Sequence, residues 1–245
     1  MIYFVSDAHL GSLLEQDSRA HEMKLVNWLE QIRADATIVY LMGDIFDFWF
    51  EYKTVVPKGF VRLFGKLAEI VDSGIEVHFF TGNHDIWAFD YFHKEIGLKV
   101  HYGPQIVEHS GKKFFLAHGD GLLNADKKFG FLRSIFHSKL LQKLFGCIPP
   151  RIGQSLGYAW SKANRERILH ADNSYKGEDK EELVLFAKQY LEKNEPVDFF
   201  VFGHRHLDLN LQLRGGSQMI ILGDFVSIFS YGMFDGTAFT LEYLD

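Results

Sequence analysis

Five short polar clusters, each placed just after an apolar run, carry residue types that bind divalent metals. In chain order they are Asp7-Ala8-His9, Gly43-Asp44-Ile45-Phe46-Asp47, Gly82-Asn83-His84-Asp85, Ala117-His118-Gly119-Asp120 and Gly203-His204-Arg205-His206. Carboxylates and imidazoles suit manganese, iron and zinc, and one carboxylate can bridge two ions about 3.5–4 Å apart. Each cluster alone is more often a cap, a turn or a satisfied polar group. All five together predict a dinuclear metal site.

The spacing within the clusters fits this interpretation. Residues two apart on an extended segment reach the same side, which suits the Asp7/His9 and His204/His206 pairs. Glycine precedes Asp44, Asn83 and His204, and glycine permits tight turns close to an ion.

The apolar runs before the clusters have the length of short buried strands. We expect strands at residues 2–6, 37–42 and 76–81, with helices at 18–32 and 60–71 between them. A hairpin is expected over residues 105–117, around Ser110-Gly111. Later strands are expected near residues 199–202, 207–213, 219–222 and 238–243. This alternation predicts an α/β fold, a two-sheet sandwich flanked by helices, with the clusters at the carboxyl ends of the strands.

A helical pattern interrupts the strands from about residue 126 to residue 170, and a further helix is expected over 179–193. We therefore expect residues 1–125 and 170–245 to form the core, and residues 126–169 to form an inserted helical cap. Residues 127–168 contain nine basic residues and one acidic residue, a net charge of +8, whereas the whole chain has −6.

Apolar residues recur at helical spacing within this basic segment. Packing on the core would explain part of the pattern, but a basic amphipathic segment is also typical of a membrane-surface element or a cap over an anionic, lipid-like substrate. The acidic charge of the whole chain argues against a nucleic-acid partner, and no protein partner is predicted.

Three observations bear on location. The single cysteine, Cys147, excludes an internal disulfide and suits a reducing compartment. No signal peptide is visible, and no apolar run approaches the ~18 residues of a membrane span. We expect a cytoplasmic protein, with peripheral contact to the inner membrane through the cap.

The order of the five clusters resembles that of the calcineurin-like metallophosphoesterases, whose motifs are D-x-H, G-D-x-x-D, G-N-H-[DE], H and G-H-x-H. The resemblance implies a four-layer αββα sandwich and two ions that share Asp44. One ion would take Asp7, His9, Asp44 and His206, and the other Asp44, Asn83, His118 and His204. His84 would be the catalytic histidine, and Asp85 would orient it. The implied reaction is attack on phosphorus by a metal-bridging hydroxide.

Within that superfamily the chain is similar to the UDP-2,3-diacylglucosamine pyrophosphatases of lipid A synthesis. The similarity rests on the run from Gly43 to Trp49, on His118-Gly119-Asp120 and on Ser161-Lys162. It implies a cap that holds acyl chains, manganese as the metal, and release of 2,3-diacylglucosamine 1-phosphate and UMP. The implied substrate contacts are Asp126, Phe129, Ser161, Asn164 and Arg165.

One position departs from that family. Its best-known branch has arginine where this chain has His84, so the chain keeps the general G-N-H-D motif of the superfamily. Two alternatives therefore stay open. One is a paralogous phosphoesterase or phosphodiesterase with another nucleotide-linked, lipid or soluble substrate. The other is a scaffold without catalysis, against which the complete set of metal-binding residues argues.

Overall fold

The computed structural model describes residues 1–123, 136–169 and 174–244 and contains two β-sheets. In the first, β1, β2, β3 and β4 run parallel, and β10 and β11 extend one edge antiparallel. The strand order is β11-β10-β1-β2-β3-β4. The bounds are β1 Ile2–Val5, β2 Ile38–Leu41, β3 Glu76–Phe80, β4 Lys99–His101, β10 Ser230–Phe234 and β11 Phe239–Tyr243.

The second sheet has the order β5-β6-β7-β9-β8. Its three central strands, β6, β7 and β9, run parallel, and the outer strands are antiparallel to them. The bounds are β5 Gln105–His109, β6 Lys112–Leu116, β7 Phe199–Phe202, β8 Asp208–Gln212 and β9 Gln218–Leu222.

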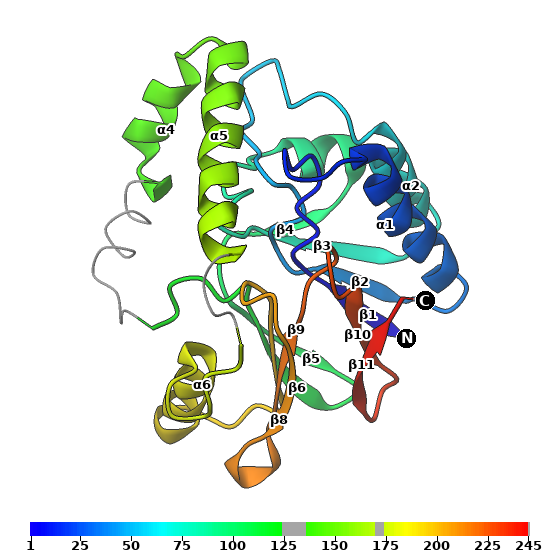
Figure 1. The fold of residues 1–245 in the computed structure, drawn as a ribbon. Coiled ribbons are helices and arrows are strands. Elements are labelled where there is room, and N and C mark those ends of the chain that lie inside the picture. Colours follow the sequence, from blue (N-terminus) through cyan, green and yellow to red (C-terminus); the bar gives the residue numbers. More distant parts are fainter. Residues whose placement is uncertain (124–135, 170–173, 245) are drawn as a thin grey trace.

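Helices cover the outer faces of both sheets (Figure 1). Between the sheets lies one apolar cluster that includes Phe4, Phe114 and Phe234. Helices α1 (Ser18–Ile32) and α2 (Val61–Asp72) pack outside the first sheet, and α6 (Glu182–Lys193) packs outside the second. The predicted α/β class and the four-layer αββα order are therefore confirmed.

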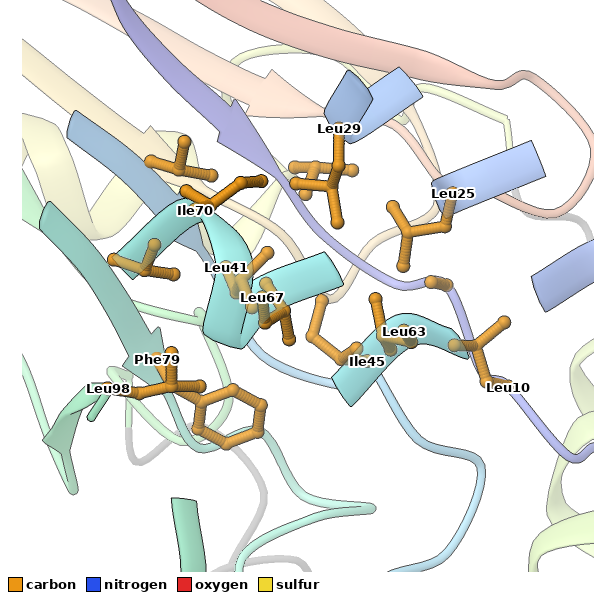
Figure 2. Close-up of a cluster of buried hydrophobic side chains, with 14 of the residues drawn as sticks. Leu10, Leu25, Leu29, Leu41, Ile45, Leu63, Leu67, Ile70, Phe79 and Leu98 are labelled. Carbon is orange, nitrogen blue, oxygen red and sulfur yellow. The ribbon is translucent and has the colours of Figure 1, made fainter. Parts of the chain in front are cut away.

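The cluster under α1 and α2 shows why these segments are helical. Leu25 and Leu29 are four residues apart in α1, as are Leu63 and Leu67 in α2, and all four are fully or almost fully buried. They meet Leu41 and Phe79 on the outer face of the sheet (Figure 2). Spacing of four places side chains on one helix face, which is the face that the sheet covers.

Outside the predicted cap, the expected strands and helices agree with the structure to within three residues at their ends. Two strands were missed, as were the short helical turns Phe92–Ile96 and Arg214–Gly216. Strand β4 has only three residues, too few to show a period of two. Strand β10 has Gly232 at its centre, where a Cβ atom would meet the Phe239 ring at 2.5 Å. Both strands are stabilised by their neighbours in the sheet more than by their own sequence pattern.

Two further helices, α4 (Lys139–Gly146) and α5 (Pro150–Leu169), lie at one end of the sandwich (Figure 1). An aromatic cluster joins these helices to the core. Its core residues are Phe48, Phe50, Tyr52 and Trp87, and they pack against Phe145 of α4 and Tyr158 of α5. The predicted cap limits, 126 and 169, stay a prediction, because residues 124–135 and 170–173 lie outside the described chain. In the described ranges, no helix combines the length and apolar character that crossing a bilayer requires.

Helix α5 depends on a glycine for its close approach to the core. A Cβ atom on Gly157 would lie 2.3 Å from the Phe48 ring, whereas a Cβ atom on Gly65 in α2 would meet nothing within 4 Å. Alanine for glycine in a helix normally stabilises by about 0.5–1 kcal/mol, because glycine loses more backbone entropy on folding.

We predict that Gly157→Ala destabilises the protein by roughly 1–3 kcal/mol through overpacking, and that Gly65→Ala stabilises it by about 0.5–1 kcal/mol. Denaturant unfolding measures both variants. Equal stabilisation by the two substitutions would contradict the seating of α5 on Phe48.

Candidate metal centre

The two sheets bring all five polar clusters to one edge. Asp7, Asp44 and Asn83 follow the carboxyl ends of the parallel strands β1, β2 and β3. His118 and His204 follow β6 and β7, which are parallel in the other sheet. The carboxyl ends of parallel strands form the ligand-binding edge of α/β sheets. The fifth cluster continues from His204 to His206, so all five meet.

One group of possible ligands comprises Asp7, His9 and His206. The Nε2 atoms of His9 and His206 are 3.1 Å apart. Asp7 Oδ1 lies 3.7 Å from His9 Nε2 and 3.5 Å from His206 Nε2. Three ligand atoms therefore surround one point, although they come from opposite ends of the chain.

A second group comprises Asp44, His118 and His204. Asp44 Oδ2 lies 3.3 Å from His118 Nε2 and 3.9 Å from His9 Nε2, so the same oxygen faces both groups. Asp44 Oδ1 accepts a hydrogen bond of 2.8 Å from the His84 backbone N–H, which fixes the carboxylate. Asp44 therefore lies between the two groups.

The backbone is strained at these residues. Eight non-glycine residues in the described chain have positive φ, and five of them belong to the two groups: Asp7, His9, Asp44, His204 and His206. A left-handed conformation costs of order 1–3 kcal/mol for such residues and is concentrated at functional sites. The fold therefore holds these side chains in place at a cost in backbone energy.

Glycines make room for the ligands at two strand exits. A Cβ atom on Gly82 would lie 2.2 Å from Asp44 Oδ1, and one on Gly203 would lie 1.9 Å from Ser6 Oγ. Both positions need glycine because the polar side chains of neighbouring strands approach the backbone directly.

Unsatisfied atoms in the site indicate a cation. Asp7 Oδ1, Asn83 Oδ1 and His118 Nε2 are buried without a hydrogen-bond partner. Leaving such an atom unpaired costs about 1–3 kcal/mol. His118 Nδ1 donates to the Met42 carbonyl at 2.9 Å, so its Nε2 is the nitrogen left for a metal. Carboxylate, imidazole and amide oxygen together fit divalent first-row metals.

The electrostatics of Asp44 and His204 agree with this donor set. Burial lowers the pKa of His9 and of His118, but the neighbouring carboxylates raise that of His9 to about 9 and that of His118 well above its ordinary value. Burial raises the pKa of Asp44, but the imidazoles of His118 and His84 lower that pKa well below its ordinary value. Burial lowers the pKa of His204 to about 4. Asp44 is thus ionised and His204 neutral near pH 7, as metal ligands must be.

His84 is oriented by the backbone of Asp47. Its Nδ1 donates a hydrogen bond of 2.8 Å to the backbone carbonyl of Asp47. The Asp85 carboxylate instead accepts backbone N–H groups of Gly82 and Ile45, at 2.7 and 2.9 Å. Asp85 therefore holds two strand-exit loops together, and the role predicted for it toward His84 stays a prediction.

Asp47 is a residue whose importance the sequence analysis missed. Its fully buried carboxylate lies 3.4 Å from His9 Nδ1 and accepts a hydrogen bond of 2.7 Å from Ser161 Oγ. Arg165 Nη1 lies 3.3 Å from the same carboxylate. Asp47 thus links α5 to His9 and His84. The second aspartate of the G-D-x-x-D motif was a signal available in the sequence.

Ser161 and Arg165 both contact Asp47 in the structure. The Ser161 side chain is fully buried, and its hydroxyl also lies 3.2 Å from His84 Nδ1. The substrate contacts expected of the two residues stay a prediction. Asn164 is half-buried on the same helix, and Asp126 and Phe129 lie outside the described residues.

Asp224 was also missed. It follows β9 at the same sheet edge, and its Oδ2 lies 3.3 Å from His206 Nδ1. Its Oδ1 accepts the backbone N–H groups of Val226 and Ser227, at 2.9 and 2.6 Å. A carboxylate on Nδ1 leaves Nε2 of the ring to the metal. The turn after β9 thus carries a carboxylate that orients His206.

A strand-edge cluster of carboxylates and imidazoles around two adjacent points, with a histidine beside them, is the site of a metal-dependent hydrolase. The family described as calcineurin-like phosphoesterase matches residues 1–208. The chain belongs to this family of metal-dependent phosphoesterases.

Named relatives cover almost the whole chain. A UDP-2,3-diacylglucosamine hydrolase from Porphyromonas gingivalis is 43% identical over 100% of this chain and 97% of its own length. A protein of the same name from Haemophilus influenzae is 27% identical over 91% of this chain and 89% of its own. A solved dimetal phosphatase from Danio rerio covers 98% of this chain and 97% of its own, at 13% identity and a TM-score of 0.47.

We predict that Asp47→Asn weakens divalent metal binding by about 10–100-fold, since partners of metal-ligating histidines have effects of this size. Titration calorimetry with Mn²⁺ measures the change. Asp72→Asn, at the exposed end of α2, is the matched control and should bind as the wild type does. Wild-type affinity in Asp47→Asn would show that Asp47 does not position His9.

Proposed function

We propose that the protein hydrolyses the pyrophosphate of UDP-2,3-diacylglucosamine to 2,3-diacylglucosamine 1-phosphate and UMP. The names of the relatives support this substrate, among them one 43% identical over the full chain. The observation that carries the proposal is an apolar cavity that opens beside His84 and beneath the helices α4 and α5.

The cavity has a volume of about 190 Å³ and an almost entirely apolar wall. Its apolar residues include Phe48, Trp87, Phe136, Phe145, Leu156 and Trp160. Asn83 and His84 complete it on the side of the metal centre. Burying apolar surface contributes about 25 cal/mol per Å², so this wall favours an acyl chain. A small soluble phosphodiester would leave it uncovered.

The proposed ligand sets are those expected from the motifs: Asp7, His9, Asp44 and His206 for one ion, and Asp44, Asn83, His118 and His204 for the other. Bound divalent ions supply a nucleophile at neutral pH and neutralise the charge that develops on phosphoryl oxygens. Manganese is proposed as the physiological metal, and the same donors also accept iron or zinc.

His84 is proposed to move the proton of the reaction. Because Nδ1 donates to the Asp47 carbonyl, Nε2 is the nitrogen that can exchange a proton with a bound substrate. Burial lowers the pKa of His84, which makes the protonated ring a better acid toward the leaving oxygen. Asp47 and Ser161 keep the ring in place.

A peripheral position on the cytoplasmic face of a membrane is part of the proposal. Leu140, Leu144, Ile152 and Leu156 on α4 and α5 are each more than half exposed. Lys139, Lys143 and Arg151 lie on the same two helices, which contain no acidic residue up to Glu166. Exposed apolar side chains among cations fit an anionic lipid surface. The exposed free thiol of Cys147 suits a reducing compartment.

We predict that the Mn²⁺-loaded protein releases UMP from UDP-2,3-diacylglucosamine, and that His84→Ala loses about 10²–10⁴-fold in rate. The variant should still bind two ions, because His84 is outside the proposed ligand sets. UMP release by chromatography and metal content by mass spectrometry provide the two readouts. If the protein turned over a generic phosphodiester but released no UMP, it would be a phosphoesterase of a paralogous branch with another substrate.

Asp44→Ala tests the shared ligand. It removes the oxygen that faces both groups, so we predict a loss of at least one of the two ions and of most activity. Metal content after dialysis measures the first effect. Two retained ions with full turnover would disprove the bridging assignment.

The membrane proposal predicts that the double variant Leu140→Glu, Leu144→Glu binds vesicles of anionic phospholipid at least about tenfold more weakly, through lost apolar contact and added repulsion. Val61→Glu is the control, since Val61 is 75% exposed and belongs to α2 and not to α4 or α5. Co-sedimentation with vesicles measures binding. If both changes weakened vesicle binding equally, the proposed membrane contact would not lie on α4 and α5.

A further inference from the structure

The described residues form a polar cavity on another side of the metal centre. It has a volume of about 220 Å³, and its wall includes Gly119, Gly121, Glu182, Leu183, His204 and Arg205. His204 belongs to the Asp44 group of metal ligands, so this cavity adjoins the same centre as the apolar cavity. The two cavities have no lining residue in common.

A third, narrow space has one lining residue in common with each of the two cavities. It is only about 20 Å³ in volume and passes His118 and Asp120. It shares Ile86 with the apolar cavity and Gly119 with the polar one. Asn83 and His84 line the apolar cavity and His204 lines the polar one, so both cavities adjoin the metal centre. A long substrate whose middle lies at the metal centre has its two ends toward walls of opposite character.

The wall of the polar cavity combines three kinds of chemistry. Arg205 is fixed by Glu181, whose carboxylate accepts from Nε at 2.7 Å and from Nη2 at 3.2 Å. The exposed carboxylate of Glu182 is an acceptor for hydroxyl groups. Gly119 and Gly121 present backbone without a side chain, and Leu183 adds an apolar surface.

The charge of this wall limits what it can bind. Glu181 and Glu182 together outweigh Arg205, which disfavours a second phosphate next to them. A group with hydroxyls and a flat, mostly neutral ring fits better, provided that its phosphate lies at the metal centre. A nucleoside 5′-monophosphate has this arrangement.

We propose that the polar cavity binds the nucleoside 5′-monophosphate half of a nucleotide-linked substrate. Glu182 accepts the ribose hydroxyls, and Leu183 with the Gly119–Gly121 backbone contacts the ring. This assignment rests on the proposed function, because it requires the anhydride to lie at the metal centre with the lipid half in the apolar cavity.

The test compares the affinities of UMP and inorganic phosphate for the Mn²⁺-loaded protein by calorimetry. Phosphate reports the metal centre alone, so the affinity ratio measures the nucleoside contribution. We expect UMP to bind at least about tenfold more tightly than phosphate, equivalent to about 1.4 kcal/mol. Glu182→Trp, which fills the cavity, should bring the ratio close to one, and Glu182→Gln should lower it by a smaller factor.

Glu192→Gln is the matched control, because Glu192 is exposed on the same helix and lines a different cavity. It should keep the wild-type ratio. A wild-type ratio near one, or an unchanged ratio in Glu182→Trp, would overturn the proposal.

Turnover of the lipid substrate separates this proposal from the function on which it rests. If the ratio of UMP affinity to phosphate affinity depended on Glu182 but no UMP were released from UDP-2,3-diacylglucosamine, the nucleotide-binding cavity would stand and the lipid substrate would be rejected. UMP release with an unchanged ratio would retain the function and reject the cavity.

Discussion

The position of the Asp44 carboxylate constrains most of the structure around it. It is 2% exposed, receives the His84 N–H on one oxygen and faces both His118 and His9 with the other. A buried carboxylate is strongly destabilising unless it is paired. The partners come from both sheets, so the apolar cluster between the sheets must hold their edges together. Bound cations would offset the remaining cost.

Asp47 extends this constraint from the metal centre to the cap. Its carboxylate contacts His9 in the core and both Ser161 and Arg165 on α5, while its carbonyl orients His84. The placement of α5 and the orientation of two site histidines are therefore coupled through one residue. Gly157 allows this coupling, because α5 can approach Phe48 only without a side chain at that position.

The sequence was most informative where a signal is local. The exits of β1, β2, β3, β6 and β7 could be found because an apolar run ends in a polar cluster, and family motifs then ordered the clusters. Contacts that depend on tertiary packing were not accessible. Asp85 and Asp47 are both buried acids at the ends of their motifs. Only the structure shows that Asp85 holds loops together and that Asp47 orients histidines. Strand β4 was missed for the same reason, since pairing with β3 stabilises it.

The environment of His84 connects the acid-base chemistry to the substrate. The ring forms part of an apolar wall, and its centroid lies 5.7 Å from that of the tilted Trp160 ring, so burial favours its neutral form. A permanently charged arginine at this position would need a nearby anion at all times, because an unpaired charge in an apolar wall is costly. A histidine can be neutral when the cavity holds only an acyl chain and charged when a phosphate arrives. Retaining histidine in the G-N-H-D motif is thus compatible with a lipid-binding wall.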